Sequence, residues 1–280
     1  MSDAPGGDAT GPLVASMWWY AATVLEPARA LKRRGFTVVA PASGDELVPL
    51  PRPGLGPRFS QEWPEPVLLD RPTEHDHLVA EFDQMAQVYD AYVRPFSGPI
   101  FAEALTVLAP LLAADARLLD AGCGAGRELR EMARTVPAGE VVGIDLAADM
   151  VREAAAGARA AGLDNTAFHQ ADVGALPSEF EGAFDVVYCC LAHHHYPEPA
   201  AAASEMCRAL RPGGLYAIID PGPAWFNASA APLARSADPG WIGFHTPAEF
   251  RAMLLAAGFA RVRWEELLPG FGVALAQKAA

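Results

Sequence analysis

The chain has 280 residues, of which 51% are hydrophobic, and its formal net charge at pH 7 is −13. This length and apolar content allow one large domain, or one domain with a small additional segment, and they exclude a wholly disordered chain. A nucleic-acid-binding protein needs a basic face that neutralises phosphates, whereas 34 acidic residues here oppose 21 scattered basic ones. The charge therefore excludes DNA, RNA and anionic membranes as expected partners and favours a small-molecule ligand.

The sequence has no pattern typical of a membrane or secreted protein. No apolar run reaches the roughly 18 residues of a membrane-spanning helix, and no basic segment precedes the apolar stretch around residues 17–25. We therefore expect a cytoplasmic protein with free thiols and no bound metal, and the sequence leaves open whether it forms a homodimer. The cysteines, whose spacing fits neither a zinc site nor a disulfide framework, are Cys123, Cys189, Cys190 and Cys207.

Residues 1–70 differ in composition from the rest of the chain. A mostly apolar run over residues 13–34 predicts a helix, and two short β runs within residues 36–50 predict a hairpin. Residues 51–66 are rich in proline, which predicts a stiff linker without regular structure. The sequence thus predicts a small N-terminal appendage over residues 1–70, followed by a ligand-binding domain over residues 71–280.

The rest of the chain has the pattern of an α/β protein. Residues 76–112 are predicted to be helical because apolar residues recur there at helical spacing. Short β runs then alternate with helices, which implies right-handed βαβ units and a sheet covered on both faces. The sequence therefore predicts a doubly wound, mostly parallel, seven-stranded sheet that ends in a C-terminal antiparallel hairpin. The predicted strands are Arg117–Asp120, Glu140–Asp145, Thr166–Asp172, Phe184–Cys190, Leu215–Asp220, Arg261–Leu267 and Phe271–Gln277, and the helices between them include Arg127–Arg134, Ala147–Ala161 and Pro199–Leu210.

A glycine-rich segment follows the first predicted strand. Asp120 ends that strand, and Gly122, Gly124 and Gly126 come next, directly before a helix. Glycine lets the backbone turn sharply and approach a ligand, and the start of a helix offers unpaired N–H groups. A glycine triplet alone is a weak signal, but its place between a strand and a helix is typical of a nucleotide site.

Acidic residues at the ends of three successive strands indicate which nucleotide is bound. Asp120 would repel the pyrophosphate of a dinucleotide, whereas it suits the ammonium group of S-adenosylmethionine. Asp145 ends the second strand, where a carboxylate can accept hydrogen bonds from ribose hydroxyls, and Asp172 ends the third, where it can accept one from adenine. The alternative for Asp120 and Asp145 is capping of a helix or turn.

At these residues the sequence resembles the class I S-adenosylmethionine-dependent methyltransferases, in their small-molecule branch. The similar segments are LLDAGCGAGRELREMA, VVGIDLAADMVREA, HQADVGALP, FDVVYCCLAHHHYPEP, RALRPGGLYAIID and TPAEFRAMLLAAGF, in the family's order. The resemblance covers residues 82–280 and implies S-adenosylmethionine as the cofactor. It places Asp120, Gly122, Gly124 and Gly126 at the methionine end, Asp145 at the ribose, Met150, Asp172 and Val173 at the adenine, Cys190 or Leu191 near the sulfonium, and Tyr89 and Tyr92 on a helix that covers the cofactor.

The sequence departs from the family's pattern in two informative ways. After the fourth strand it has Cys-Cys-Leu-Ala in place of the Asp/Asn-Pro-Pro-aromatic motif of amino methyltransferases, which argues against a nucleobase or amide nitrogen as the methyl acceptor. It also lacks the acidic cluster of the metal-dependent catechol-type enzymes, because only Asp220 stands at the end of the fourth and fifth strands.

Three consecutive histidines follow the fourth strand. A neutral imidazole can act as a general base toward a hydroxyl group, so His193, His194 and His195 are the candidate catalytic residues, with His194 or His193 preferred. Neighbouring side chains of a loop point in different directions, which argues against a metal site made of these three alone. The alternative is that one histidine packs near the cofactor and the others face solvent.

A long connection, Pro221–His245, is predicted between the fifth strand and a helix that begins at a capping box formed by Thr246 and Glu249. A long loop at this edge of a sheet commonly forms a lid or a substrate wall, and aromatic residues in it suit a planar acceptor. Packing within the loop, or a dimer contact, is the alternative. The candidate substrate-binding residues are Tyr92, Tyr196, Trp225, Trp241, Phe244 and His245.

Together these features predict transfer of a methyl group from S-adenosylmethionine to an oxygen, nitrogen or carbon atom of a small, aromatic or polyketide-like metabolite, as in natural-product biosynthesis. One alternative is an enzyme of the same fold that binds S-adenosylmethionine but catalyses a cyclisation, decarboxylation or hydroxylation. Another is a binding protein with a vestigial site, against which the intact glycine segment and the acids argue. Nothing in the sequence separates the two enzymes.

Overall fold

The structure is a computed structural model, and it describes residue 17 and residues 20–35, 93–238 and 240–280. The predicted hairpin and proline-rich linker, and the candidate residues Tyr89 and Tyr92, lie outside the described residues. No helix in these described ranges is both long enough and apolar enough to cross a membrane.

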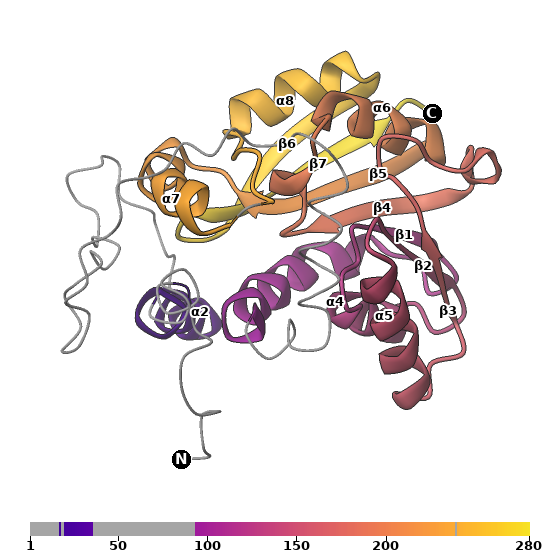
Figure 1. Cartoon of the computed structure of the whole chain (residues 1–280), viewed down its shortest axis with the longest axis horizontal. Coiled ribbons are helices and arrows are strands. Elements are labelled where there is room, and N and C mark those ends of the chain that lie inside the picture. The colour runs from indigo at the N-terminus through magenta and orange to yellow at the C-terminus, as the bar shows by residue number, and fades with distance from the viewer. Residues whose placement is uncertain (1–16, 18–19, 36–92, 239) are drawn as a thin grey trace.

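A seven-stranded sheet forms the centre of the described structure (Figure 1). Its strands are β1 (Arg117–Ala121), β2 (Glu140–Asp145), β3 (Thr166–Gln170), β4 (Phe184–Cys190), β5 (Leu210–Pro221), β6 (Phe259–Leu268) and β7 (Phe271–Lys278). They lie in the order β3-β2-β1-β4-β5-β7-β6, with β1 to β5 parallel and β7 antiparallel to both β5 and β6. The predicted doubly wound sheet with a closing hairpin is confirmed. Strands β2 and β3 are added on one side of β1, and β4 and β5 on the other, so the order of the strands reverses between β1 and β4. At such a point the carboxyl ends of the two strands border a crevice, in which sheets of this kind bind ligands.

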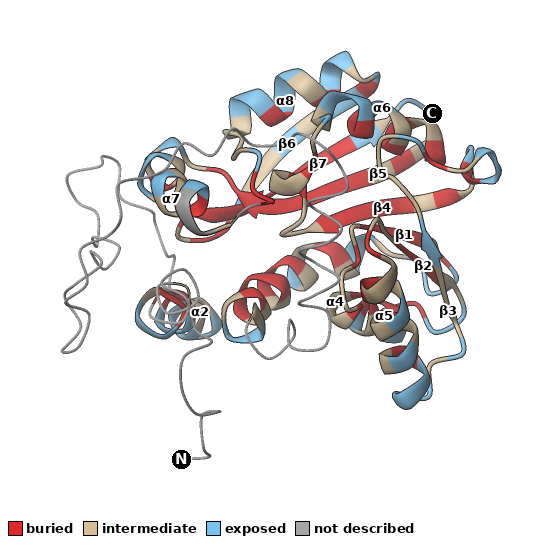
Figure 2. Cartoon of the chain, in the orientation of Figure 1, coloured by how far each residue is buried: buried red, intermediate tan, exposed pale blue. Residues whose placement is uncertain are grey.

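Helices cover both faces of the sheet. They are α4 (Arg127–Thr135), α5 (Ala148–Ala160), α6 (Pro199–Ala209), α7 (Ala224–Ala237) and α8 (Pro247–Ala256), and residues 93–108 are helical as well. Side chains alternate between the two faces along each strand. Leu118 and Tyr188 therefore join one apolar cluster with residues 93–108 and α4, whereas Leu119 and Cys189 join a second cluster with α6 and α8. Both faces of the central strands are buried (Figure 2).

The region between β5 and α8 differs from the prediction. The sequence predicts an irregular connection over Pro221–His245, but residues Ala224–Ala237 form α7. The prediction was wrong because the segment is rich in alanine, the strongest helix former, which outweighs the interruption by Pro232. Strand β5 also begins earlier than predicted, because Leu210 pairs with Phe184 across a shift in register.

The described N-terminal residues pack into the same core as the rest of the molecule. A short π-helical turn, η1 (Ala21–Leu25), continues directly into α2 (Glu26–Arg33), so the predicted helix is confirmed over residues 20–33. Leu25 is fully buried in the apolar cluster that also contains α4 and residues of the sheet. The division of the chain at residue 70 falls outside the described residues and stays a prediction.

Hydrogen bonds attach this N-terminal helix to the turn between β6 and β7. The hydroxyl group of Tyr20 donates to the carbonyl oxygen of Pro269 at 2.9 Å, and Nζ of Lys32 donates to that of Leu267 at 2.8 Å. We call these two hydrogen bonds the terminal latch. They join segments from opposite ends of the described chain.

Candidate functional site

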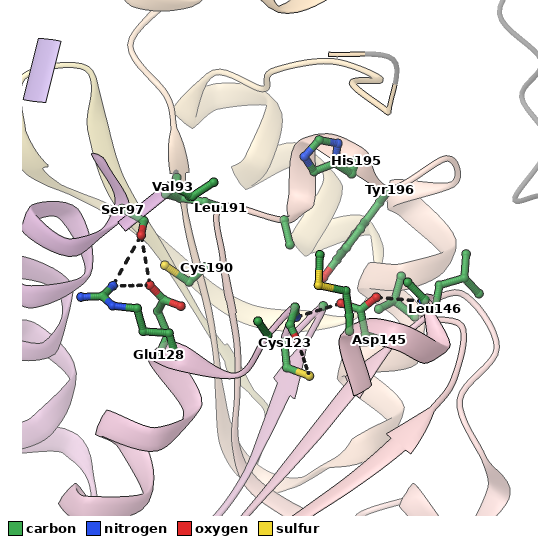
Figure 3. A pocket seen from close by; sticks show the side chains of 18 of the residues that line it. Val93, Ser97, Cys123, Glu128, Asp145, Leu146, Cys190, Leu191, His195 and Tyr196 are labelled. Carbon is green, nitrogen blue, oxygen red and sulfur yellow. Dashed lines mark hydrogen bonds and ion pairs between the residues drawn. The ribbon is translucent and has the colours of Figure 1, made fainter. Parts of the chain in front are cut away.

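A cavity lies at the carboxyl ends of β1, β2 and β4, where the strand order reverses. One end is lined by the loop after β2 and the start of α5, and the other by residues 93–97 and the start of α4. In Figure 3 Asp145 lies toward the first end, Ser97 and Glu128 lie at the second, and Cys123 of the glycine segment lies between them.

Two of the three glycines in the segment after β1 line this cavity. Gly122 and Gly124 have positive φ angles of 78° and 49°. A Cβ atom at Gly122 would lie 2.9 Å from Cβ of Ala192, which is too close for any larger residue. Gly126 also has a positive φ angle, 73°, but it does not line the cavity, and a Cβ there would lie 2.7 Å from Cβ of Ala154 in α5. Gly126 therefore allows two helices to pack closely, and the predicted cofactor contact is not found at this residue.

Asp145 stands at the end of β2, as predicted, and lines the cavity. Its Oδ2 accepts a hydrogen bond from the backbone N–H of Gly124 at 2.9 Å, and its Oδ1 accepts one from that of Ala147 at 3.0 Å. The carboxylate thus fixes both the glycine segment and the start of α5. A carboxylate oxygen can accept more than one hydrogen bond, so this structural role is compatible with binding of a ribose hydroxyl.

Asp120 does not occupy the predicted position at the methionine end. Its side chain is buried, does not line the cavity, and accepts a hydrogen bond at Oδ2 from the hydroxyl of Tyr188 at 2.8 Å. Burial raises the pKa of Asp120 well above its usual value, although the Tyr188 hydrogen bond opposes this shift. Along β1 the side chains alternate, so Asp120 points to the same face as Leu118, toward Tyr188 on the neighbouring strand.

The three residues predicted for the adenine side lie together in the structure. Met150, Asp172 and Val173 all line the cavity, and Met150 is almost fully buried. Strand β3 ends at Gln170, so Asp172 lies in the turn that follows, where its Oδ1 accepts a hydrogen bond from the backbone N–H of Gly174 at 2.7 Å.

Cys190 and Leu191 line the cavity next to the end of β4. Leu191 has a φ angle of 52°, and it is the one residue other than glycine with a positive φ angle in the part of the chain that the structure describes. Its backbone N–H donates to the carbonyl oxygen of Ile219 at 2.8 Å, which holds this costly conformation in place.

Sequence reasoning missed a polar group at the second end of the cavity. Ser97, Arg127 and Glu128 line it, and Nη1 of Arg127 lies 2.8 Å from Oε1 of Glu128. Arg127 and Glu128 could have been predicted from the sequence, because they directly follow Gly126 at the start of a helix that borders the site. Ser97 had no such signal, because its place depends on how the preceding helix packs.

The three histidines form a short 3₁₀ turn, η5 (His193–His195), and have different environments. His193 is buried against Tyr196 and Phe250, does not line the cavity, and burial holds its pKa well below the usual value. It therefore has a packing role. His195 lines the cavity, and burial lowers its pKa too.

His194 is paired with a carboxylate that sequence reasoning did not include in the site. Nδ1 of His194 lies 2.7 Å from Oδ1 of Asp220, which is fully buried near the end of β5. Burial lowers the pKa of His194, but the Asp220 carboxylate raises it, and the net pKa is above the usual 6.5. His194 does not line the cavity, but His195 does. The ring centroids of these two histidines are 4.2 Å apart.

The candidate substrate residues are only partly brought together. Tyr196 lines the cavity and donates its hydroxyl hydrogen to the carbonyl oxygen of Ala121 at 2.7 Å. The other four described candidates do not line the cavity. Of these, Phe244 contacts the His194 ring and Trp241 contacts Phe244, whereas Trp225 packs against Phe226 in α7 and His245 packs against His193.

One group of possible metal ligands occurs among the described residues. A ligand atom from each of His194, His195 and Asp238 lies within 4.8 Å of the others. Nδ1 of His194 already bonds to Asp220, and Nε2 of His195 and Oδ2 of Asp238 are 3.9 Å apart. This arrangement is that of hydrogen-bonding and ion-pairing side chains, so it fits the predicted acid–base role of the histidine turn better than a metal site.

The cavity fits S-adenosylmethionine. Its first end combines a carboxylate, Asp145, with the apolar side chains of Met150 and Val173, as an adenosine group requires. Its second end contains a cation and an anion, Arg127 and Glu128, as a zwitterionic amino acid requires. Gly122 and Gly124 line the cavity without adding side chains to it.

Comparisons with known proteins agree with this geometry. Residues 112–240 match the family model for a methyltransferase domain. The chain is 39% identical over 143 residues to the nocamycin O-methyltransferase of Saccharothrix syringae (51% of this chain, 50% of that protein) and 34% identical over 154 residues to a ubiquinone biosynthesis O-methyltransferase of Psychrobacter arcticus (52% and 59%). The chain thus spans about half the length of the curated relatives it matches.

A solved structure extends the likeness in fold. The DhpI–SAH complex aligns with a TM-score of 0.58 over 73% of this chain and 97% of that chain, at 22% sequence identity. The chain is therefore similar over residues 112–240 to methyltransferase domains, and its strand order, with the cavity at the reversal point, agrees with the fold that it shares with this solved structure.

Proposed function

We propose that this chain methylates a hydroxyl oxygen of a small metabolite, with His194 as the general base and Asp220 as the residue that positions it. The observation on which the proposal rests is the 2.7 Å contact between Nδ1 of His194 and Oδ1 of Asp220. Two relatives are named as O-methyltransferases, which supports oxygen as the acceptor atom over nitrogen or carbon.

The His194–Asp220 pair has the chemistry that a general base needs. A buried carboxylate that accepts the Nδ1–H bond keeps the proton on Nδ1 and leaves the lone pair of Nε2 available. The backbone N–H of Ile242 donates to the carbonyl oxygen of His194 at 2.8 Å, which holds the turn in place. The Asp220 charge also favours the imidazolium that forms when Nε2 takes up a proton, and the raised pKa of His194 reflects this preference.

When bound, S-adenosylmethionine supplies a methyl group that its positively charged sulfur has already activated. The residues of the chain then have two tasks, which are to align the acceptor oxygen with the methyl group and to remove the proton of the hydroxyl. In the proposed step Nε2 of His194 would take up the proton that the acceptor hydroxyl loses as the methyl group leaves the cofactor's sulfur for the acceptor oxygen. Asp220 keeps its contact with Nδ1 and stabilises the charged ring.

Aromatic side chains beside the histidine turn favour a planar acceptor of aromatic or polyketide-like character. The ring of Phe244 lies 5.4 Å from that of His194, and the ring of Trp241 lies 5.2 Å from that of Phe244. Flat apolar surfaces of this kind bind planar ligands well. One relative is named for nocamycin, which is consistent with a role in natural-product biosynthesis.

The proposal is tested by incubating the purified chain with S-adenosylmethionine and a panel of phenolic and enolic compounds. We expect S-adenosylhomocysteine and an O-methylated product, both measured by mass spectrometry. His194→Gln should lower turnover at least about 100-fold, whereas His169→Gln, a change at an exposed histidine on β3, should leave it near wild type. His193→Ala should act through packing alone, and EDTA should have no effect.

Several results would contradict the proposal. A His194→Gln variant that is folded and retains more than about a tenth of wild-type turnover would exclude His194 as the base. Methylation only at nitrogen or carbon would exclude the hydroxyl acceptor. Conversion of the acceptor without formation of S-adenosylhomocysteine would instead identify a cyclisation, decarboxylation or hydroxylation.

A further inference from the structure

Strand β6 forms one edge of the sheet. Within the described part of the chain, β7 is the one strand that pairs with it, so its outer side is open to a further strand. The pairing with β7 shifts in register near both ends of β6, between Phe259 and Arg261 and between Glu266 and Leu268. Residues 261–266 between these two bulges form a regular stretch. A regular strand at an open edge is a template on which another strand can add.

The exposed side chains of this stretch carry charges of both signs. Arg261, Arg263 and Glu265 point to one face of the sheet, because side chains alternate along a strand. Nη1 of Arg263 lies 2.6 Å from Oε2 of Glu265, and the two side chains are 58% and 40% exposed. Arg261 and Arg263 also line a groove over this face, which leaves room for the side chains of an added strand.

We propose that two copies of this chain associate through the outer edges of their β6 strands, which pair antiparallel about a two-fold axis at Trp264. In such a pair, residues at equal distances from the axis stand opposite each other. Arg263 of each copy is then opposite Glu265 of the other copy, and symmetry makes the two ion pairs equivalent. Opposite charges that face each other across two strands stabilise their pairing. The two sheets become one continuous sheet.

The charges select this register over the neighbouring ones. An axis at any of the four charged residues of the stretch 261–266 would place that residue opposite its own copy. Like charges directly opposite each other destabilise a strand pair. An axis at Val262 would place Arg261 opposite Arg263, which is again a pair of like charges. Trp264 is therefore the one position in this stretch at which the axis brings no like charges together.

The side chain of Trp264 leaves space at the axis. Its ring lies on the opposite face of the sheet from Arg263 and stacks on Phe250 of α8, with the ring centroids 6.0 Å apart and an interplanar angle of 12°. A Cβ atom at Gly272 of β7 would overlap with the indole ring. The ring therefore lies over β7, away from the outer edge, and the rings of two facing Trp264 residues are directed apart.

The other edge of the sheet has no comparable pattern. Strand β3 is five residues long and contains no Arg, Lys, Asp or Glu, so charge selects no register there. The β6 pair itself is small. Stable interfaces bury roughly 1,200–2,000 Å² in total, more than two short strands provide, so we expect a dissociation constant of about 1–100 µM. The cavity lies at the carboxyl ends of β1, β2 and β4, away from β6 in the strand order, so the dimer and the proposed reaction are independent.

Sedimentation velocity of the full chain at about 1–200 µM tests the proposal. We expect a monomer–dimer equilibrium for the wild type. Arg263→Glu and Glu265→Arg each place like charges opposite each other at both symmetric positions, so each should raise the dissociation constant at least about tenfold. An equimolar mixture of these two variants should dimerise again, because opposite charges then face each other at both positions.

Arg134→Glu and Glu131→Arg are the matched controls. They reverse the same charges in a half-exposed pair on α4, whose atoms are 3.0 Å apart, and they should leave the dissociation constant unchanged. A wild type that stays monomeric at 200 µM, a dimer that both β6 variants leave intact, or a mixture that stays monomeric would overturn the proposal. If one single variant does not fold, the double variant Arg263→Glu/Glu265→Arg decides the question, because it should dimerise like the wild type.

Discussion

The two sides of the site differ in how their polar groups are satisfied. On the side of β1 to β3, the Asp145 carboxylate receives a backbone N–H at each of its oxygens, and Asp172 receives one as well. On the side of β4 and β5, buried polar atoms without a hydrogen-bond partner remain among the described residues: both ring nitrogens of His193, Oδ2 of Asp220 and Nδ1 of His245.

Under the proposed function, this difference corresponds to two kinds of ligand. A site for one constant cofactor can be fully built before the ligand arrives, with each carboxylate fixed by the backbone. A site that deprotonates an acceptor needs groups whose hydrogen-bonding capacity is not exhausted by the protein. Substitutions on the side of β1 to β3 are therefore expected to lower the affinity for the cofactor. Substitutions on the side of β4 and β5 are expected to lower turnover.

The largest expected effect on the cofactor side comes from Asp145→Ala. The change removes a carboxylate that holds Gly124 and Ala147, so we expect the affinity for S-adenosylmethionine to fall by about 1.5–3 kcal/mol. Calorimetry on the folded variant measures this loss. Unchanged affinity would remove Asp145 from the site and would show that the cofactor side is not organised around it.

A pair of glycine substitutions separates close packing from backbone conformation. Gly126→Ala places a Cβ atom 2.7 Å from that of Ala154 at a φ angle of 73°, so we expect a loss of about 2–4 kcal/mol in the free energy of unfolding. Gly162 has a similar φ angle of 67° but no heavy atom within 4 Å of the added Cβ, so Gly162→Ala should cost only about 1–2 kcal/mol. Denaturant unfolding of both variants measures the difference, and equal losses would contradict a packing role for Gly126.

The smallest expected effect is a shift in the pH dependence of turnover. The base must be neutral to accept a proton, and Asp220 raises the pKa of His194, so turnover should rise with pH through a midpoint above 6.5. Asp220→Asn removes the charge that raises this pKa, so the midpoint should move to lower pH while the maximum rate falls. A midpoint that is the same in Asp220→Asn and wild type would assign the titration to a different group.

Much of the fold follows from local patterns in the sequence. Each strand was predicted from the spacing of apolar residues, which is set within a few positions of the chain. The glycine segment and Asp145 were predicted because each follows or ends such a strand. Helix α7 was missed because aromatic residues and prolines suggested a loop, whereas the alanine content of the segment decides its conformation.

The details of the site depend on contacts between distant segments. His194 and Asp220 are 26 residues apart, and Ser97 and Glu128 are 31 apart, so no spacing rule connects them. The direction of Asp120 was also not predictable, because it depends on the hydroxyl of Tyr188 in the neighbouring strand, 68 residues away. Sequence alone identified residues close to the cavity but not which of them line it.

The terminal latch has a consequence for the order of events during synthesis. Tyr20 and Lys32 bond to carbonyl groups that are 249 and 235 residues further along the chain. The helix around Leu25 therefore leaves the ribosome long before its docking site exists, and strand β7, which inserts between β5 and β6, emerges after every other strand of the sheet. Contacts between such distant residues form late and slowly. Until they do, the helix around Leu25 lacks the terminal latch, so its final docking is expected to be a late step of folding.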